Sequence, residues 1–274
     1  MSSRRKPGSR TFALNQRWIP AFAGMTSKGL AWLPVIDWQQ PWFAPYRELG
    51  PAVAARVAAG DSLTRALNAH CAVADLQFVA PQVQGGEVYE AFVARTGCVP
   101  TRDNAHDFFN GMVWLRWPAL KRRINLLHAG EIARQGGGAT RGAVRDRLTL
   151  FDENGALLAA PRALQSALQR RDWQDLFIAQ RALWHSARLT IVGHALLEKL
   201  VQPRKAITSH VWLGDAAHAF AASAPIEPPF APLPVLGVPG WWPGNEDRDF
   251  YADVAVFRPA RSPRSKDSAH PCRS

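Results

Sequence analysis

Hydrophobic and polar positions recur at helical spacing through most of the middle of the chain. Apolar residues three and four positions apart, with polar residues between them, are typical of helices with one buried side. This pattern predicts helices over residues 48–59, 61–70, 103–117, 119–134, 161–170, 173–187 and 194–201. Shorter runs rich in branched residues predict strands over 76–83, 189–192 and 207–213. Residues 88–96 fit either a helix or an extended segment.

Residues 145–158, with the sequence RDRLTLFDENGALL, predict a β-hairpin. Leucines alternate with other residues in the first half, and Asn154-Gly155 is the dipeptide that tight hairpin turns favour most. This hairpin adds a small β-component to a chain of many helices. We therefore expect an α+β fold, predominantly helical with a small antiparallel sheet, and the alternative is a mainly α fold.

Two segments rich in proline and aromatic residues fit neither pattern. Residues 32–46 contain three Pro and three Trp, and residues 225–257 are similarly dense in Pro, Gly and aromatic side chains. Proline removes a backbone donor and stops long helices. Because exposed tryptophans would leave an apolar surface patch, we expect both segments to wrap over the core in an ordered but irregular form.

The predicted helix over residues 103–117 has two chemically different sides. At 100° per residue, one stripe is mostly polar and carries Asp103, His106, Asp107, Asn110, Trp114 and Trp117. The other side is apolar and carries Phe108, Phe109, Met112, Val113 and Leu115. We expect Asp103 or Thr101 to cap the first turn and Pro118 to end or kink the helix. The polar stripe is the strongest candidate for a site in the sequence.

The basic excess of the chain is concentrated at its ends. The formal net charge is +11, of which residues 1–28 carry +6 and residues 258–274 carry +4, which leaves +1 for residues 29–257. The organisation we predict is a disordered or misassigned basic tail over 1–28, a single globular domain over 29–258 and a disordered basic tail over 259–274. The near-neutral middle predicts no specific binding of nucleic acid.

The first residues and the cysteines bear on the cellular setting. The segment RWIPAFAGMT resembles a bacterial intergenic repeat that has been translated, which favours an extension over a functional segment. Residues 15–17, Asn-Gln-Arg, interrupt the apolar run that a signal peptide needs, and no run of 18 apolar residues predicts a membrane helix. The three cysteines are widely spaced and form no disulfide framework, so we expect a cytoplasmic protein.

Five sequence blocks resemble a known family. In order, they are VPTRDNAHDFFNGMVWL, RDRLTLFDENGALL, GHALLEKL, RKAIT and PLPVLGVPGWWP. Together they resemble the bacterial domain-of-unknown-function family 3025 over roughly residues 30–258. Ala105 and Trp117 depart from the bulkier residue and the Phe that this resemblance leads us to expect. The resemblance implies one intact domain of a bacterial cytoplasmic protein, and it implies no activity.

The polar stripe supplies the candidate catalytic residues His106, Asp107, Asn110 and Asp103. An imidazole close to carboxylates suits a general base or a metal ligand. The competing interpretation is structural, because Asp and Asn at a helix start cap the first turn and hold it by hydrogen bonds. The sequence favours the structural interpretation.

Weaker candidates for metal binding are His194, Glu198 and His210. His194 and Glu198 are four residues apart, so they share one side of a helix, but an ordinary surface pair has the same spacing. We interpret Asp152 and Glu153 as turn residues of the predicted hairpin. The chain contains no G-x-S-x-G elbow, P-loop or dinucleotide fingerprint.

Two function hypotheses remain at this point. The first is a hydrolase-like or metal-assisted enzyme centred on His106 and Asp107, and the second is a non-catalytic binding protein with an aromatic-rich surface. Cofactors and partners are unknown from the sequence. Imidazoles that converge on a carboxylate in one pocket favour the enzyme, and scattered imidazoles favour the binding protein.

Overall fold

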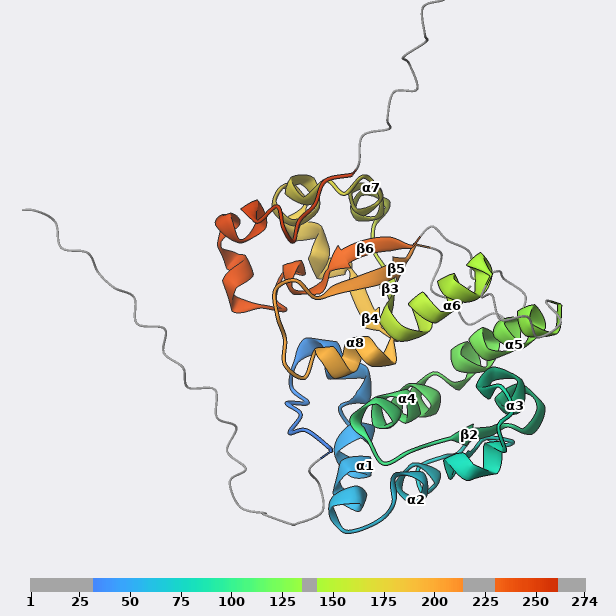
Figure 1. The fold of residues 1–274 in the computed structure, drawn as a ribbon. Helices are drawn as coiled ribbons and strands as arrows, with labels where there is room; N and C mark the ends of the chain where they lie inside the picture. Colours follow the sequence, from blue (N-terminus) through green and yellow to red (C-terminus); the bar gives the residue numbers. More distant parts are fainter. Residues whose placement is uncertain (1–31, 135–141, 214–229, 261–274) are drawn as a thin grey trace, which may run out of the picture.

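The structure is a computed structural model that describes residues 32–134, 142–213 and 230–260 (Figure 1). Its α-helices are α1 (Leu49–Ala58), α2 (Leu63–Asn68), α3 (Tyr89–Thr96), α4 (Ala105–Arg116), α5 (Pro118–Arg134), α6 (Ala143–Asn154), α7 (Arg162–Arg170) and α8 (His194–Lys199). Its strands are β1 (Gln77–Val79), β2 (Cys98–Pro100), β3 (Gly155–Ala159), β4 (Arg188–Ile191), β5 (Thr208–Trp212) and β6 (Ala231–Pro234). The predicted α+β class, with helices dominant, is confirmed.

Short helical turns fill much of the remaining chain. They are η1 (Pro41–Tyr46), η2 (Pro81–Gln84), η3 (Asp175–Ala179), η4 (Arg181–Ser186), η5 (Val235–Gly237), η6 (Pro243–Glu246) and η7 (Arg248–Ala252). The helix predicted over 173–187 is therefore wrong in detail, because this segment forms a π turn and a 3₁₀ turn. The strand predicted over 76–83 is shorter than expected, because Pro81 begins a 3₁₀ turn.

The larger sheet is mixed rather than purely antiparallel. Its strand order is β4-β3-β5-β6, and β3 lies parallel to β5 but antiparallel to β4. Strands β5 and β6 are antiparallel, and β1 and β2 form a separate parallel pair. The alternation of the side chains in β5 sends Ser209 and Val211 into the core and leaves Thr208 and His210 on the other face of the sheet.

The hairpin predicted over residues 145–158 is wrong. Residues 143–154 form α6, and β3 begins directly at Gly155. Leu148 and Phe151 are three residues apart, so both reach one apolar cluster together with Leu120 and Ile124 of α5. Helical burial therefore outweighs the local turn signal of Asn154-Gly155, and β3 takes its partners from β4 and β5, which lie far along the chain.

Helix α4 has the apolar side that the sequence predicts. Phe108, Phe109 and Met112 are fully buried in the main core. The cap is different from the prediction, because the side chain of Asn104 accepts a hydrogen bond from the backbone N–H of Asp107. Pro118 occupies the first position of α5, where its missing donor costs nothing.

The aromatic segments cover the core as expected within the described residues. Trp42 and Phe43 of η1 are buried, and Phe43 stacks on Phe109 of α4. Near the C-terminal end of the described chain, Tyr251 and Phe257 pack around Phe177. No helix of the described residues is long and apolar enough to cross a membrane. The predictions for residues 1–28, residues 225–229 and most of 259–274 fall outside the described residues.

Candidate metal centre

A cavity of about 360 Å³ opens where α3, α4, α5, α6 and α8 meet. Its polar lining includes Tyr89, Arg102, His106, Asn110, Lys121, Asn125, His128, Asp152, Glu153 and His194. Figure 1 shows α8 lying against α4, with α6 reaching the same point from the side. The cavity therefore gathers polar groups from segments that are distant in the sequence.

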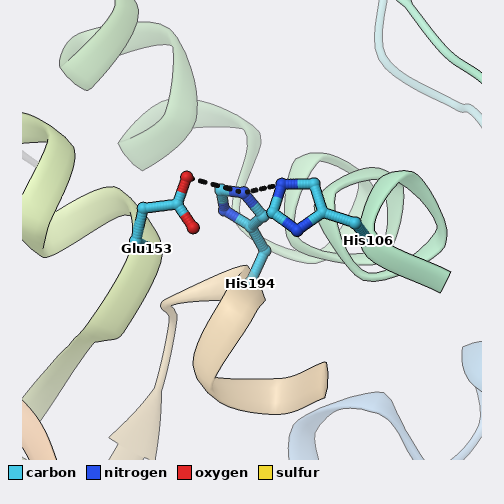
Figure 2. A group of neighbouring side chains, drawn as sticks. All are labelled: His106, Glu153 and His194. Carbon is cyan, nitrogen blue, oxygen red and sulfur yellow. Dashed lines mark hydrogen bonds and ion pairs between the residues drawn. The ribbon is translucent and has the colours of Figure 1, made fainter. Parts of the chain in front are cut away.

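Two imidazoles meet in this cavity. His106 lies in the first turn of α4, and His194 is the first residue of α8. Their Nε2 atoms are 3.1 Å apart, and the two rings are nearly perpendicular (Figure 2). His194 is buried and His106 is partly exposed, so the pair has one side closed and one side open to the cavity.

A carboxylate completes the group. The Oε1 atom of Glu153, next to the end of α6, lies 3.5 Å from Nε2 of His194. Figure 2 shows the three side chains pointing toward one another from α4, α6 and α8. One ligand atom from each of His106, Glu153 and His194 lies within 4.8 Å of the others. Among the residues that the structure describes, this is the one such group of three with metal-ligating chemistry.

Gly193 allows this convergence. The backbone N–H groups of Val192 and Gly193 both donate to the carbonyl oxygen of Gly155, so the start of α8 is held against the junction of α6 and β3. A Cβ on Gly193 would collide with backbone atoms of residues 153–155. The absence of a side chain therefore lets two backbones approach closely and brings His194 beside Glu153.

The remaining ring nitrogens fix the tautomers of both imidazoles. Nδ1 of His194 lies 2.8 Å from the backbone oxygen of Asp152, which only accepts hydrogen bonds. Nδ1 of His106 lies 3.2 Å from a carboxylate oxygen of Glu198. With a proton on each Nδ1, the Nε2 atoms of both rings present lone pairs toward the cluster. Two lone pairs and one carboxylate thus face a common point.

Burial and neighbouring charges shift the pKa values of the groups in and around the cluster. Burial lowers the pKa of His194 to about 4, so this ring is neutral at pH 7. Burial also raises the pKa of Glu153, an effect that the nearby His106 opposes and Asp152 reinforces. For Asp152, the desolvation that would raise the pKa is outweighed by Lys121 and His194, and the net pKa is lowered. Lys121 donates to Asp152 over 2.6 Å.

The spacing fits one metal ion. Two ligand atoms that bind a tetrahedral zinc at about 2.0–2.2 Å stand roughly 3.3–3.6 Å apart. The distances of 3.1 Å between the two Nε2 atoms and 3.5 Å between His194 and Glu153 are close to this range, and the ligand atoms of His106 and Glu153 lie within 4.8 Å of each other. The contact of each Nδ1 with an oxygen acceptor is also the arrangement by which proteins orient histidine ligands.

The four predicted catalytic residues have different surroundings in the structure, and only one of them joins the cluster. His106 enters the cluster, whereas Asp107 lines the same cavity but accepts hydrogen bonds from the backbone N–H and guanidinium group of Arg102. Asp103 is turned away and accepts a hydrogen bond from the backbone N–H of Leu63. Asn110 lines the cavity one turn beyond His106 and donates to the hydroxyl of Tyr89. The polar stripe therefore combines structural groups with groups that face the cavity.

The three weaker candidates for metal binding also lie in three different positions. His194 joins the cluster, whereas Glu198 contacts Nδ1 of His106 and is not itself part of the cluster. His210 lines a different cavity near β6. Two of the three imidazoles singled out in the sequence thus converge on a carboxylate. Glu153 was interpreted as a turn residue, and its place in the cluster depends on α6, which the hairpin prediction excluded. A helical interpretation of residues 143–154 would have placed its side chain at a helix end.

The comparison with protein families assigns the chain. A family model described as "Protein of unknown function (DUF3025)" matches residues 76–261, which is more than half of the sequence. The chain belongs to the DUF3025 family. The resemblance noted in the sequence is confirmed, and the part that matches the DUF3025 model contains His106, Glu153 and His194. No curated protein and no solved structure matches the chain.

Proposed function

We propose that this DUF3025 protein is a zinc-dependent hydrolase. The zinc ligands are Nε2 of His106, Nε2 of His194 and the carboxylate of Glu153. The observation that carries the proposal is the approach of the two Nε2 atoms to 3.1 Å while both Nδ1 atoms face oxygen acceptors. A cation bound at this point would compensate the repulsion among two Nε2 lone pairs and a carboxylate.

The ligand set favours zinc and an open coordination position. Two histidines and one glutamate are a ligand set of catalytic zinc sites, in which water occupies the fourth position. Zinc lowers the pKa of its bound water to about 7, which supplies hydroxide at neutral pH. A zinc ion held by these residues would supply hydroxide for attack on the carbonyl carbon or phosphorus of a substrate, and the proton that the bound water loses would go to the leaving group.

The groups around the ligands have supporting roles. Glu198 orients His106 through Nδ1, and the backbone oxygen of Asp152 does the same for His194. Lys121 is buried beside Asp152 and lines the same cavity, so its ammonium group supplies positive charge next to the developing oxyanion. These three residues are placed to position ligands and to stabilise charge.

Metal analysis of untagged protein tests the proposal. We expect about one zinc per chain in the wild type, and less than about a tenth of that in the variants His106→Gln and His194→Gln, because each variant removes one of three protein ligands. His210→Gln is the matched control, because His210 is a half-buried histidine in another cavity and should leave the zinc content unchanged. Melting curves check that all variants are folded.

Activity is then measured with aryl esters and aryl phosphates as generic substrates. Hydrolysis should stop on treatment with a chelator and return with zinc in the wild type, but not in His106→Gln. Wild-type protein without stoichiometric metal would overturn the proposal and favour the binding-protein hypothesis. Iron in place of zinc would overturn the hydrolytic assignment, because two histidines and a carboxylate also form the iron site of oxygenases.

A further inference from the structure

A second cavity, of about 710 Å³, lies away from the metal ligands. Its walls come from α6, from the residues after α7 and from residues 255–258, and its floor is the ladder between β5 and β6. We call this cavity the arginine groove, after its lining residues Arg147, Arg171 and Arg258. None of its described lining residues belongs to the candidate metal centre.

The floor of the groove is one face of the sheet. Thr208 pairs with Pro234 and His210 pairs with Pro232, so these four side chains are cross-strand neighbours on the same face. The two prolines have no N–H group and give a rigid, mostly apolar surface. Thr208 and His210 add a hydroxyl and an imidazole, which offer hydrogen bonds to a bound molecule.

The charge of the groove is unbalanced. Arg147 and Arg171 are partly buried, and neither guanidinium group makes a hydrogen bond or ion pair with the residues that the structure describes. No carboxylate is present among the described lining residues of this cavity. Arg171 also has a φ of +53°, a conformation that residues other than glycine seldom adopt. Guanidinium groups without a partner among the described residues are suited to bind a carboxylate or phosphate through two parallel hydrogen bonds.

Aromatic side chains form the apolar part of the groove. Trp173 is buried, and its indole N–H donates to the backbone oxygen of Arg258 over 2.8 Å, which fixes the ring. Phe230 is stacked on Phe151 of α6 with ring centroids 4.9 Å apart. The groove thus pairs fixed aromatic surfaces with the guanidinium groups of Arg147 and Arg171, which have no partner among the described residues, and its volume is sufficient for a ligand of nucleotide size.

We propose that the arginine groove binds an organic phosphate of nucleotide size. Arg147 and Arg171 hold the phosphate, and the flat ring of the ligand lies on the surface formed by Phe230, Pro232 and Trp173. Two guanidinium groups match the two negative charges of a phosphate monoester, whereas a carboxylate carries only one. This site is independent of the zinc proposal, because its residues and its ligand differ from those of the metal centre.

Calorimetric titration with AMP, GMP, CMP and UMP tests the proposal on the full-length protein. We expect at least one nucleotide to bind with a Kd below about 100 μM. Its nucleoside and inorganic phosphate should each bind at least about tenfold more weakly, because each carries only half of the recognised chemistry. Weaker binding by all four nucleotides overturns the proposal.

Variants locate the binding site. Arg147→Gln and Arg171→Gln should each weaken nucleotide binding at least about tenfold, since each removes a charged partner of the phosphate. The matched control is Arg162→Gln on α7, because Arg162 is exposed and does not line the groove. Binding that is unchanged in the double variant Arg147→Gln/Arg171→Gln overturns the proposal, and so does binding that is lost in His106→Gln.

Hydrogen exchange on the wild-type protein gives a readout that does not depend on a folded variant. Bound nucleotide should slow amide exchange in β5 and β6 and in the residues after α7, and it should leave the first turn of α4 unchanged. Protection at α4 and α8 in place of the groove contradicts the proposal, because it places the ligand at the metal centre.

Discussion

Two regions of the molecule each hold a partly or fully buried carboxylate, and they hold it in opposite ways. At the start of α4, Asp107 accepts hydrogen bonds from the backbone N–H, Nε and Nη2 of Arg102, at 2.6, 3.0 and 3.1 Å. At the junction of α6 and β3, the carboxylate of Glu153 has the imidazole of His194 at 3.5 Å, and no described hydrogen bond reaches it.

The comparison separates a structural acid from one that is available to a ligand. A carboxylate surrounded by donors is already stabilised, so a cation gains little by approaching it. A desolvated carboxylate without donors is costly until a cation compensates it. Asp107 is next to a histidine in the sequence and Glu153 is not. The number of hydrogen-bond donors around each carboxylate is therefore the better guide to a ligand site.

The largest effect is expected from Glu153→Gln. The variant keeps the size of the side chain but removes the negative charge, so zinc affinity should fall at least about a hundredfold, or about 2.7 kcal/mol. The free energy of unfolding of the metal-free protein should change by less than about 1 kcal/mol, because no hydrogen bond is lost. Competition with a zinc-binding dye and chemical denaturation measure the two quantities. Unchanged zinc affinity would remove Glu153 from the site.

Asp107→Asn should have the opposite profile. The amide oxygen can take the position of Oδ2 and keep the bonds from the backbone N–H and Nε of Arg102, but the NH2 group then replaces Oδ1 and faces Nη2. The lost bond and the lost charge should destabilise the fold by about 1 kcal/mol, since the side chain of Arg102 is 65% exposed. Zinc affinity should stay within about threefold of the wild type. Loss of zinc in a variant of near-normal stability would return Asp107 to the site.

Asp103→Asn should give the smallest change. The amide oxygen still accepts the hydrogen bond from the backbone N–H of Leu63, which Oδ1 of Asp103 accepts at 2.8 Å. We expect a change in unfolding free energy below about 0.5 kcal/mol and no change in zinc content, because the side chain is exposed and outside the cavity. A measurable loss of zinc would show that the loop before α4 positions His106.

The spacing of apolar residues and the helix stop signals were sufficient to predict much of the fold. The apolar side of α4, the end of that helix before Pro118 and most of the other helices follow from spacing and from helix stop signals. The same periodicity placed His106 on the cavity side. It could not separate His106 from Asp103 and Asp107, because a helical projection gives directions and not partners. Those partners are Leu63 and Arg102.

The site as a whole depends on contacts that no local pattern contains. Glu153 was missed because Asn154-Gly155 is a strong hairpin signal, and the burial of Leu148 and Phe151 against α5 decided in favour of a helix. The spacing of His194 and Glu198 suggested one shared site. In the structure, Glu198 contacts His106 and not His194. His106 is 88 residues before His194 in the sequence. Such pairings depend on how α4 packs on α8.

The position of β3 inside its sheet has a consequence for the synthesis of the protein. Strand β3 leaves the ribosome before both of its neighbours, since β4 and β5 follow it in the chain. At about 5–20 residues per second, the roughly fifty residues that separate the ends of β3 and β5 take about 3–10 s to translate. During this interval a largely apolar strand has no sheet partners, and the three proposed zinc ligands are incomplete until His194 has emerged. A nascent chain released earlier therefore exposes β3 to other unpaired strands and contains only two of the three proposed ligands.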